Sequence, residues 1–458
     1  MPSVVLSQVC SRWRQITADY PQLWASINIT FKDLRDHTKR ILQLFLENSE
    51  GCDLNVRLFR QRWADYPLAQ AEKDVWELLT RNLWRCRKLS FYAEYSPLFQ
   101  FPSSGDQQIS FPNLMIYEED APRPESHHER YNSGLIAWWK ALRDAPKLTR
   151  VSTWVFHSPE SLSYSQLTVL YVHLYPSEIL ELLHILPSSI QLEDLTLMHG
   201  WASTETHHLT FNPRPVEIPS LQKLVIGGFL IDHNSLREIL ELLRTPALKT
   251  LALHCWGGHA MENGWPSSIL SLLERSPMLR DVLLYNDQCE PPTSDPSARP
   301  SLVLPLLYAI PNVEVLQLGI DSSEYALHFE EHADPLLSDL LGKLAQVELT
   351  PFLPKLVNLS LYMTDITLDT KCVEAILSTA TARSPSVLAN SGARGLIRPI
   401  SHLSVLRFRD IATPFMPVDI DADLSARVQG LRNDGVVVDI GKGGHVPTQL
   451  VPRTVIEG

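Results

Sequence analysis

The stretch Leu192-Glu-Asp-Leu-Thr-Leu197 decides the fold, because its pattern returns many times along the chain. The pattern is a six-residue phrase with apolar residues at positions one, four and six, often preceded by a proline. In an extended chain, residues two apart point to the same face, so the last two apolar residues of each phrase share a face. Each copy therefore predicts a short strand that is buried on one side.

Copies of this phrase run through most of the chain. Clear copies begin at Leu192, Leu221, Leu248, Leu279, Val313, Leu356 and Leu403, looser copies at Leu148 and Leu167, and faint copies at Trp24 and Cys86. Among the clear and looser copies, the separations run from 19 residues, between Leu148 and Leu167, to 47 residues, between Leu356 and Leu403. Leucine-rich repeats have a period of about 20 to 29 residues, so this repeat overlaps that range and is irregular.

Amphipathic segments lie between the copies. Their apolar residues recur at spacings of three and four, which predicts a helix with one buried stripe in residues 177–186, 235–244, 267–276 and 371–380. Ser177, Ser235 and Ser267 stand where N-caps belong. Prolines follow three of these helices, at Pro187, Pro246 and Pro277.

One such unit cannot bury its own apolar face, whereas stacked units build a parallel sheet with helices on its other side. We therefore expect an α/β fold, an irregular leucine-rich-repeat-like solenoid with parallel strands on one face and helices on the other. A doubly wound α/β domain, which also alternates strands and helices, is the alternative. It predicts near-continuous apolar strands and Gly-rich phosphate-binding turns, which this sequence lacks.

The pattern also suggests a domain organisation. Residues 145–411 form the solenoid, residues 31–144 are divergent N-terminal repeats, and residues 412–458 are a C-terminal cap or a disordered tail with one strand-like run at 435–440. Residues 1–30 form a separate helical segment. Polar, Pro-rich insertions at 290–300, 321–335 and 384–399 are predicted to be surface loops.

Composition excludes several classes of function. The net charge of −12 argues against a nucleic-acid partner, and we expect the mild basic excess of residues 1–90, which includes Arg57, Arg85 and Lys88, to lie on solvated helix faces. Six dispersed cysteines predict neither a zinc site nor a disulfide scaffold. Because no apolar run approaches about 20 residues and Met1-Pro2-Ser3 is no signal peptide, we expect a cytoplasmic or nuclear protein without membrane contact.

Catalytic and metal-binding patterns are weak throughout. His199, Glu205 and the pair His207-His208 lack good ligand geometry, and His127-His128-Glu129 lacks the spacing of a zinc-binding helix. Asp419, Asp421 and Asp423 imitate the start of a calcium loop, but Leu424 and Gly430 stand where that loop needs Gly and Glu. We predict that the chain is not an enzyme and needs no cofactor.

Residues 3–29 carry a second pattern. The spacing predicts an amphipathic helix from residue 3 to about residue 18, with an apolar face of Val5, Leu6, Val9, Cys10, Trp13 and Ile16. The texts Leu6-Ser-Gln-Val-Cys10 and Trp13-Arg-Gln-Ile16, then Pro21 and Leu23-Trp-Ala-Ser-Ile27, resemble the C-terminal half of an F-box. Together with the repeats, they are similar to the F-box protein families of mushroom-forming fungi.

That resemblance implies a substrate receptor of an SCF-type ubiquitin ligase, in which the F-box binds the Skp-type adaptor and the repeats hold a protein target. It places Leu6, Val9, Cys10 and Trp13 on the adaptor-facing or F-box-core helix and packs Trp24 toward the repeats. The family's first helix, of the type LPxEIL, has no counterpart before Leu6. For Trp13, core packing remains open beside adaptor contact.

The target surface follows from the strand pattern. Residues between and after the apolar positions of each phrase point away from the core. We expect this exposed face to bind the target through mixed charges and aromatic side chains, which carry much of the energy at protein interfaces. The predicted residues are Asp194, Lys223, His254, Asp281, Tyr285, Gln317 and Tyr362. A leucine-rich scaffold that has lost its coupling to a ligase is the alternative function.

Overall fold

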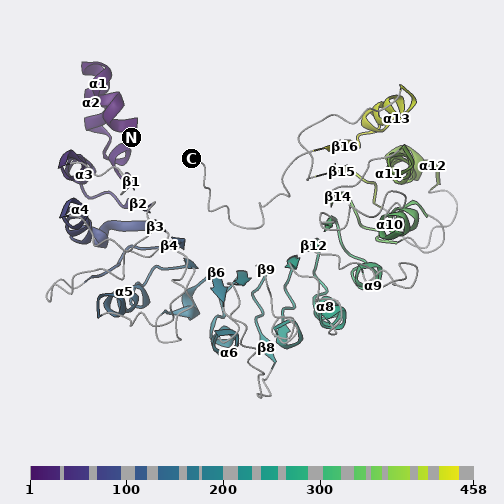
Figure 1. The fold of residues 1–458 in the computed structure, drawn as a ribbon, viewed down its shortest axis with the longest axis horizontal. Coiled ribbons are helices and arrows are strands. Elements are labelled where there is room, and N and C mark those ends of the chain that lie inside the picture. Colours follow the sequence, from purple (N-terminus) through teal and green to yellow (C-terminus); the bar gives the residue numbers. More distant parts are fainter. Residues whose placement is uncertain are drawn as a thin grey trace. The chain divides into compact units, whose positions relative to one another are not determined.

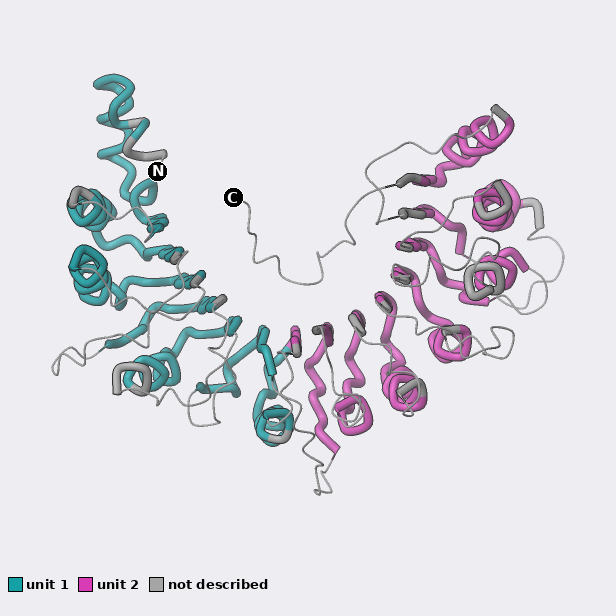
Figure 2. The backbone as a smooth tube through the Cα atoms, in the orientation of Figure 1, with its two compact units in different colours: residues 1–192 teal, residues 193–458 magenta. Residues whose placement is uncertain are grey.

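The computed structural model describes residues 2–30, 36–60, 70–93, 109–120, 133–153, 162–174, 178–199, 215–228, 239–255, 265–286, 303–320, 335–346, 352–363, 370–391, 401–410 and 422–442. The chain divides into two compact units, residues 1–192 and 193–458 (Figure 2). Each unit is built from parallel strands and helices.

Unit 1 pairs its strands in chain order, and each strand is parallel to the next. The strands are β1 (Ser26–Thr30), β2 (Leu54–Arg60), β3 (Cys86–Ala93), β4 (Ile116–Asp120), β5 (Arg150–Thr153) and β6 (Val169–Leu174). The α-helices are α1 (Pro2–Val9), α2 (Ser11–Asp19), α3 (Asp36–Asn48), α4 (Gln70–Thr80), α5 (Ser133–Arg143) and α6 (Ile179–Ile185). Short 3-10 helices are η1 (Pro21–Trp24), η3 (Leu83–Arg85), η5 (Tyr164–Gln166) and η7 (Leu186–Ser188). Helices α3 to α6 lie on one side of these strands (Figure 1).

Unit 2 repeats this arrangement. Its parallel strands are β7 (Asp194–His199), β9 (Lys223–Gly228), β11 (Thr250–Cys255), β12 (Asp281–Asn286), β13 (Val315–Ile320), β14 (Asn358–Met363), β15 (Val405–Asp410) and β16 (Val437–Lys442). Its α-helices are α8 (Trp265–Glu274), α9 (Val303–Tyr308), α10 (Pro335–Ala345), α11 (Thr370–Ala382), α12 (Pro385–Ser391) and α13 (Ala422–Asn433). They also lie on one side of the strands (Figure 1). A separate small pair joins β8 (Val216–Glu217) to β10 (Leu243–Arg244).

The predicted α/β architecture of parallel strands and helices is confirmed. Within each unit the strand order follows the chain without reversal, whereas a doubly wound sheet reverses its order at a switch point. The doubly wound alternative is therefore wrong. The sequential order is consistent with a solenoid-like α/β fold.

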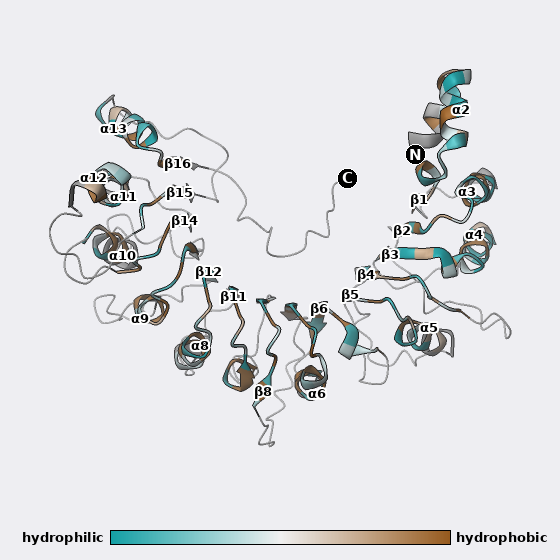
Figure 3. Cartoon of the chain, turned by 180° about the vertical axis from the view of Figure 1, so that it is seen from behind, coloured by the Kyte–Doolittle hydropathy of each residue, from teal (hydrophilic) through white to brown (hydrophobic). Residues whose placement is uncertain are grey.

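The repeated phrase builds the core as its period requires. Every quoted copy leads into a strand, and its fourth and sixth residues are buried wherever the structure describes their side chains, except at Leu284, which is partly buried. In β7, β9 and β11 the fourth-position residues Leu195, Leu224 and Leu251 are fully buried neighbours in one row across the sheet. Both the strands and the helices carry hydrophobic and hydrophilic residues side by side (Figure 3).

Two strands of unit 1 escaped the sequence pattern, each for a visible reason. The β2 stretch Leu54-Asn-Val-Arg-Leu58 has one residue fewer than the phrase, and the ladder between β2 and β3 shifts register there. The β4 stretch Leu114-Met-Ile-Tyr-Glu-Glu119 ends in a carboxylate where the phrase needs an apolar residue. Glu119 is nevertheless buried, because the Tyr117 hydroxyl donates to its Oε2 at 3.1 Å and Thr153 Oγ1 donates at 3.5 Å.

The N-terminal segment differs from the prediction of one continuous helix. Cys10 is extended (φ −160°, ψ 172°) and separates α1 from α2, and its carbonyl accepts the first hydrogen bond of α2 from the Arg14 N–H. An apolar period cannot detect a break of one residue, because the residues on either side still look helical.

Several predicted boundaries also change. Helix α8 begins at Trp265, so Ser267 lies inside its first turn and is not the N-cap, while Leu243 and Arg244 are strand and not the end of a helix. The predicted loop at 384–399 contains α12. The two alternatives for residues 412–458 are a cap and a disordered tail. In the described part of this segment, α13 and β16 fit the cap, since β16 pairs with β15. Ser177, Ser235 and the insertions at 290–300 and 321–334 lie outside the described residues.

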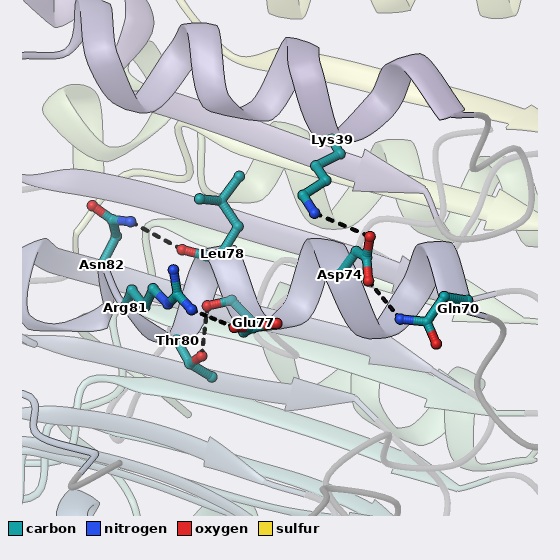
Figure 4. A network of polar contacts seen from close by, with 8 residues as sticks. All are labelled: Lys39, Gln70, Asp74, Glu77, Leu78, Thr80, Arg81 and Asn82. Atoms are coloured by element: carbon teal, nitrogen blue, oxygen red, sulfur yellow. Dashed lines mark hydrogen bonds and ion pairs between the residues drawn. The ribbon is translucent and has the colours of Figure 1, made fainter. Parts of the chain in front are cut away.

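Polar contacts tie neighbouring helices together on the outer side of unit 1 (Figure 4). Lys39 of α3 forms an ion pair of 3.0 Å with Asp74 of α4, and Gln70 donates to the other Asp74 oxygen at 2.6 Å. The hydrogen bond from Gln70 and then the one from Lys39 lower the pKa of Asp74. Arg81 pairs with Glu77 one turn earlier in the same region. These exposed contacts orient the helices more than they stabilise them.

Candidate interaction surface

Each unit presents a sheet face that points away from its helices, which we term the open face. It carries the third and fifth residues of each phrase and the residue that follows the sixth. In unit 2 all seven predicted target-binding residues occupy such positions in their phrases, and their role in target binding stays a prediction. They lie on β7, β9, β11, β12, β13 and β14.

Charged residues line the start of these strands. Asp194 on β7 faces Lys223 on β9 in the ladder, and Lys223 Nζ lies 3.0 Å from Asp194 Oδ2. On the next pair, Thr250 Oγ1 donates to Asp281 Oδ2 at 3.3 Å. Burial raises the pKa of Asp281 against the lowering effect of that hydrogen bond. Three of the predicted residues, Asp194, Lys223 and Asp281, therefore lie in one polar row.

The predicted aromatic residues Tyr285 and Tyr362 are buried and not exposed. At Tyr285 the burial has a steric cause. Tyr285 and Tyr362 retain only 8% and 4% of their accessible surface. The Tyr285 ring lies over Gly319 on β13, where an added Cβ would stand 1.9 Å from its Cδ2 atom. Tyr285 forms a buried cluster with Val225, Ala252 and Leu283, all on the open face.

Two acceptors in this region have no hydrogen-bond partner, namely Asp194 Oδ1 and Gln317 Oε1. Both atoms are buried although their residues are only partly buried. For His254 the structure describes the backbone position on β11 and not the side chain. The open face of unit 2 therefore carries a polar row beside a buried apolar cluster. Its predicted aromatic side chains lie in buried positions and not at the surface.

The predicted adaptor residues separate into an exposed group and one buried anchor. Val9 is 61% exposed, Trp13 is 42% exposed and Cys10 is exposed, whereas Leu6 lies in α1 with its side chain outside the description. The core-packing alternative for Trp13 is therefore wrong. Trp24 is 4% exposed, and it does pack against the first strand–helix unit, meeting Phe45 of α3 edge to face at 5.1 Å.

Trp24 also fixes the end of α2. Its indole Nε1 donates to the Thr17 carbonyl at 2.6 Å, and the Thr17 hydroxyl, itself buried, donates to the Arg14 carbonyl at 2.9 Å. These contacts satisfy carbonyls in the last turns of α2.

A cluster that the sequence did not predict lies on the open face of unit 1. Phe59 on β2 and Tyr92 on β3 are direct partners in the ladder, and their rings stack at 4.9 Å with 14° between their planes. The Arg57 guanidinium lies 5.8 Å from the centre of the Phe59 ring and 5.4 Å from that of Tyr92. We term Arg57, Phe59 and Tyr92 the Arg57 platform.

Glu118 on β4 lies beside this platform, and both of its carboxylate oxygens already accept hydrogen bonds. Glu118 Oε1 lies 2.6 Å from Lys88 Nζ, while its Oε2 accepts from Ser90 Oγ at 2.8 Å and from the Tyr92 hydroxyl at 3.4 Å. Three donors on β3 therefore hold one carboxylate on β4. The irregular phrases of β2 and β4 hid both clusters from the sequence pattern.

The basic residues of the N-terminal region do not share one environment. Arg57 and Lys88 lie on strands, and Arg85 is buried, where it donates to the carbonyls of Cys52 and Leu46 and to Ser49 Oγ. The expectation of solvated helix faces is therefore wrong for these three residues.

Within the described ranges, no three His, Cys, Asp or Glu residues are grouped as a metal site would require. The motifs at 127–129 and 205–208 and the aspartates Asp419 and Asp421 lie outside those ranges. No helix in the described part of the chain combines the length and apolar character needed to cross a membrane.

The chain matches no protein-family model and no curated protein. Among solved structures, it is similar to a crystal structure of a Bacteroides fragilis protein determined as a structural-genomics target. That chain is 13% identical, the match covers 81% of this chain and 82% of the other, and the TM-score is 0.32. A likeness at this TM-score supports no inference about function.

Proposed function

We propose that this chain is a non-catalytic protein-interaction protein, an irregular leucine-rich-repeat-like solenoid that acts as a substrate receptor of an SCF-type ubiquitin ligase in the cytosol or nucleus. In this proposal the helices α1 and α2 are an F-box-like segment that binds a Skp-type adaptor. The open faces of the two units hold the protein target.

The observation that carries the proposal is the exposed apolar surface of α1 and α2. Val5 and Val9 are four residues apart on one face of α1 and are 63% and 61% exposed, and Trp13 of α2 is 42% exposed. Large apolar side chains that stay exposed to water favour a protein-binding role, and tryptophan is among the residue types most enriched at binding hot spots. Trp24 anchors this segment to the repeats, as a rigid connection between adaptor and target requires.

The test is co-purification of the full chain with a fungal Skp-type adaptor. We expect Trp13→Ala to weaken adaptor binding by about tenfold or more, because it removes the large exposed apolar side chain of α2. Trp84→Ala is the matched control, since Trp84 is 51% exposed but lies in η3, outside α1 and α2. If the adaptor binds neither the natural chain nor a version extended by an LPxEIL-type helix, the ligase role is refuted.

The alternative is a leucine-rich interaction scaffold without ligase coupling. It predicts that partner proteins bind the open faces while the adaptor does not bind, and that Trp13→Ala changes no interaction. Proximity labelling with the natural chain and with Trp13→Ala separates the two functions, because only the receptor loses ligase subunits.

A further inference from the structure

We infer that the Arg57 platform is a binding site for an acidic peptide segment of a protein partner, in which a Glu or Asp carboxylate pairs with the Arg57 guanidinium. The inference rests on the proposal that the chain binds a protein target, and it names where on unit 1 and by what chemistry. The site lies on β2 and β3, outside the seven residues predicted from the sequence.

The first step is that two aromatic rings hold the Arg57 guanidinium in place, while no described acidic side chain pairs with it. Its contacts in the described structure are the faces of Phe59 and Tyr92, and no described carboxylate or carbonyl accepts from its guanidinium. A cation–π contact uses the positive charge over the ring, so it leaves the N–H donors available. The side chain is partly exposed, and a ligand in solvent can therefore reach it.

The second step is that the neighbouring acidic residue cannot neutralise Arg57. Glu118 lies two strands away, and its two oxygens are engaged by Lys88, Ser90 and Tyr92. The Lys88–Glu118 pair cancels its own charge, so among the side chains that the structure describes no carboxylate pairs with Arg57 on this part of the face. The chain as a whole is acidic, with a net charge of −12, whereas this part of the face carries a positive charge.

The third step is that the site is preorganised. Phe59 and Tyr92 pair directly across two parallel strands, and such pairs hold one another in place. They restrict the arginine before a ligand arrives, which lowers the entropic cost of binding. A planar guanidinium binds a carboxylate through two parallel hydrogen bonds, so the geometry favours the side chain of Glu or Asp. The rings beside it offer apolar contact to the rest of the peptide.

The test uses the full chain and fluorescent peptides of about ten residues, a length that can lie across several strands. In the probe Glu alternates with Ser, in the neutral control Gln replaces Glu, and in a third peptide phosphoserine replaces Glu. Binding is measured by fluorescence anisotropy at two salt concentrations, since an ion pair at a surface weakens with salt.

We expect the Glu probe to bind the natural chain below about 1 mM and the Gln control to bind much more weakly. Arg57→Gln should weaken the Glu probe about tenfold. Arg57→Lys should weaken it less, because it keeps the charge but loses the planar pairing. Tyr92→Phe keeps the ring and should bind like the natural chain.

The matched control is Arg150→Gln, which removes the same charge from the exposed open-face residue of β5, where no aromatic pair lies beneath it. Circular dichroism verifies that each variant is folded. Equal loss with Arg57→Gln and Arg150→Gln, or no loss with Arg57→Gln, would overturn the site. So would binding of the phosphoserine peptide alone, which would mark a phosphate reader, or no binding of the Glu probe.

The outcome is separable from that of the adaptor experiment. A chain that binds the adaptor but not the Glu probe refutes the Arg57 platform and leaves the receptor proposal intact. A chain that binds the Glu probe through Arg57 but not the adaptor supports the platform and refutes the ligase role.

Discussion

At the scale of single residues, Gly319 shows how one side chain depends on the absence of another. The Tyr285 ring occupies the space that a Cβ at residue 319 would need. Neither residue is special in the sequence, because the two belong to different repeats and meet only through the ladder between β12 and β13.

We predict that Gly319→Ala lowers the free energy of unfolding by about 1 to 3 kcal/mol, because the tyrosine ring must leave its place in the buried cluster. Urea titration measures the change. In the matched control Gly342→Ala, the new methyl group meets no atom within 4 Å in helix α10, and we expect a gain of about 0.5 to 1 kcal/mol. Adding Tyr285→Ala should relieve the effect of Gly319→Ala, and strict additivity of the two changes would contradict the steric explanation.

At the scale of secondary-structure elements, arginines connect the end of one helix to the repeat that precedes it. Arg275 directly follows α8 and donates to the carbonyls of Leu240 and Glu241, and Arg383 directly follows α11 and donates to Leu344, in α10, and to Leu353. A cation near a helix C-terminus also stabilises the helix dipole. Buried Arg383 has its pKa lowered to about 10 by desolvation, so its hydrogen bonds offset a cost of burial.

We predict that Arg383→Met lowers the free energy of unfolding by at least about 2 kcal/mol, because it leaves the buried carbonyls of Leu344 and Leu353 without this donor. Chemical unfolding monitored by circular dichroism gives the value. Arg407→Met is the control, since Arg407 is exposed on β15, and it should change stability by less than about 0.5 kcal/mol. Equal effects of both changes would show that the helix-to-helix bonds contribute nothing.

At the scale of the whole molecule, stacked strand–helix repeats are stable only while each repeat covers the apolar side of the next. At the C-terminal end of unit 2, β16 pairs with β15, the Val437 N–H donates to the Ser404 carbonyl at 2.8 Å, and α13 packs against β16. The buried residues of this segment are Leu424, Val428 and Leu431 of α13, Val436 before β16, and Val438 of β16.

We predict that deletion of residues 411–458 lowers the Tm and causes aggregation, because β15 becomes an open edge beside exposed leucines. Differential scanning fluorimetry and size-exclusion chromatography with light scattering measure both effects. The control deletion removes residues 443–458 only and keeps α13 and β16. If both deletions lower the Tm equally, the final strand and helix are not the stabilising cap.

The sequence by itself determined the architecture, because the repeated phrase couples burial to the two-residue period of a strand and every quoted copy becomes one. It could not supply β2 and β4, where a missing residue at Leu54 to Leu58 and a buried carboxylate at Glu119 break the pattern. The positions of Asp194, Lys223 and Asp281 in their strands follow from parity alone, and the ladder brings all three into one row. Only the tertiary structure decided that Tyr285 is buried over Gly319 and that Arg57 rests on Phe59 and Tyr92. The contacts of Tyr285 with Gly319 and of Arg57 with Tyr92 join strands about 30 residues or more apart, and exposure at such positions depends on the neighbouring strand, which a local pattern cannot identify.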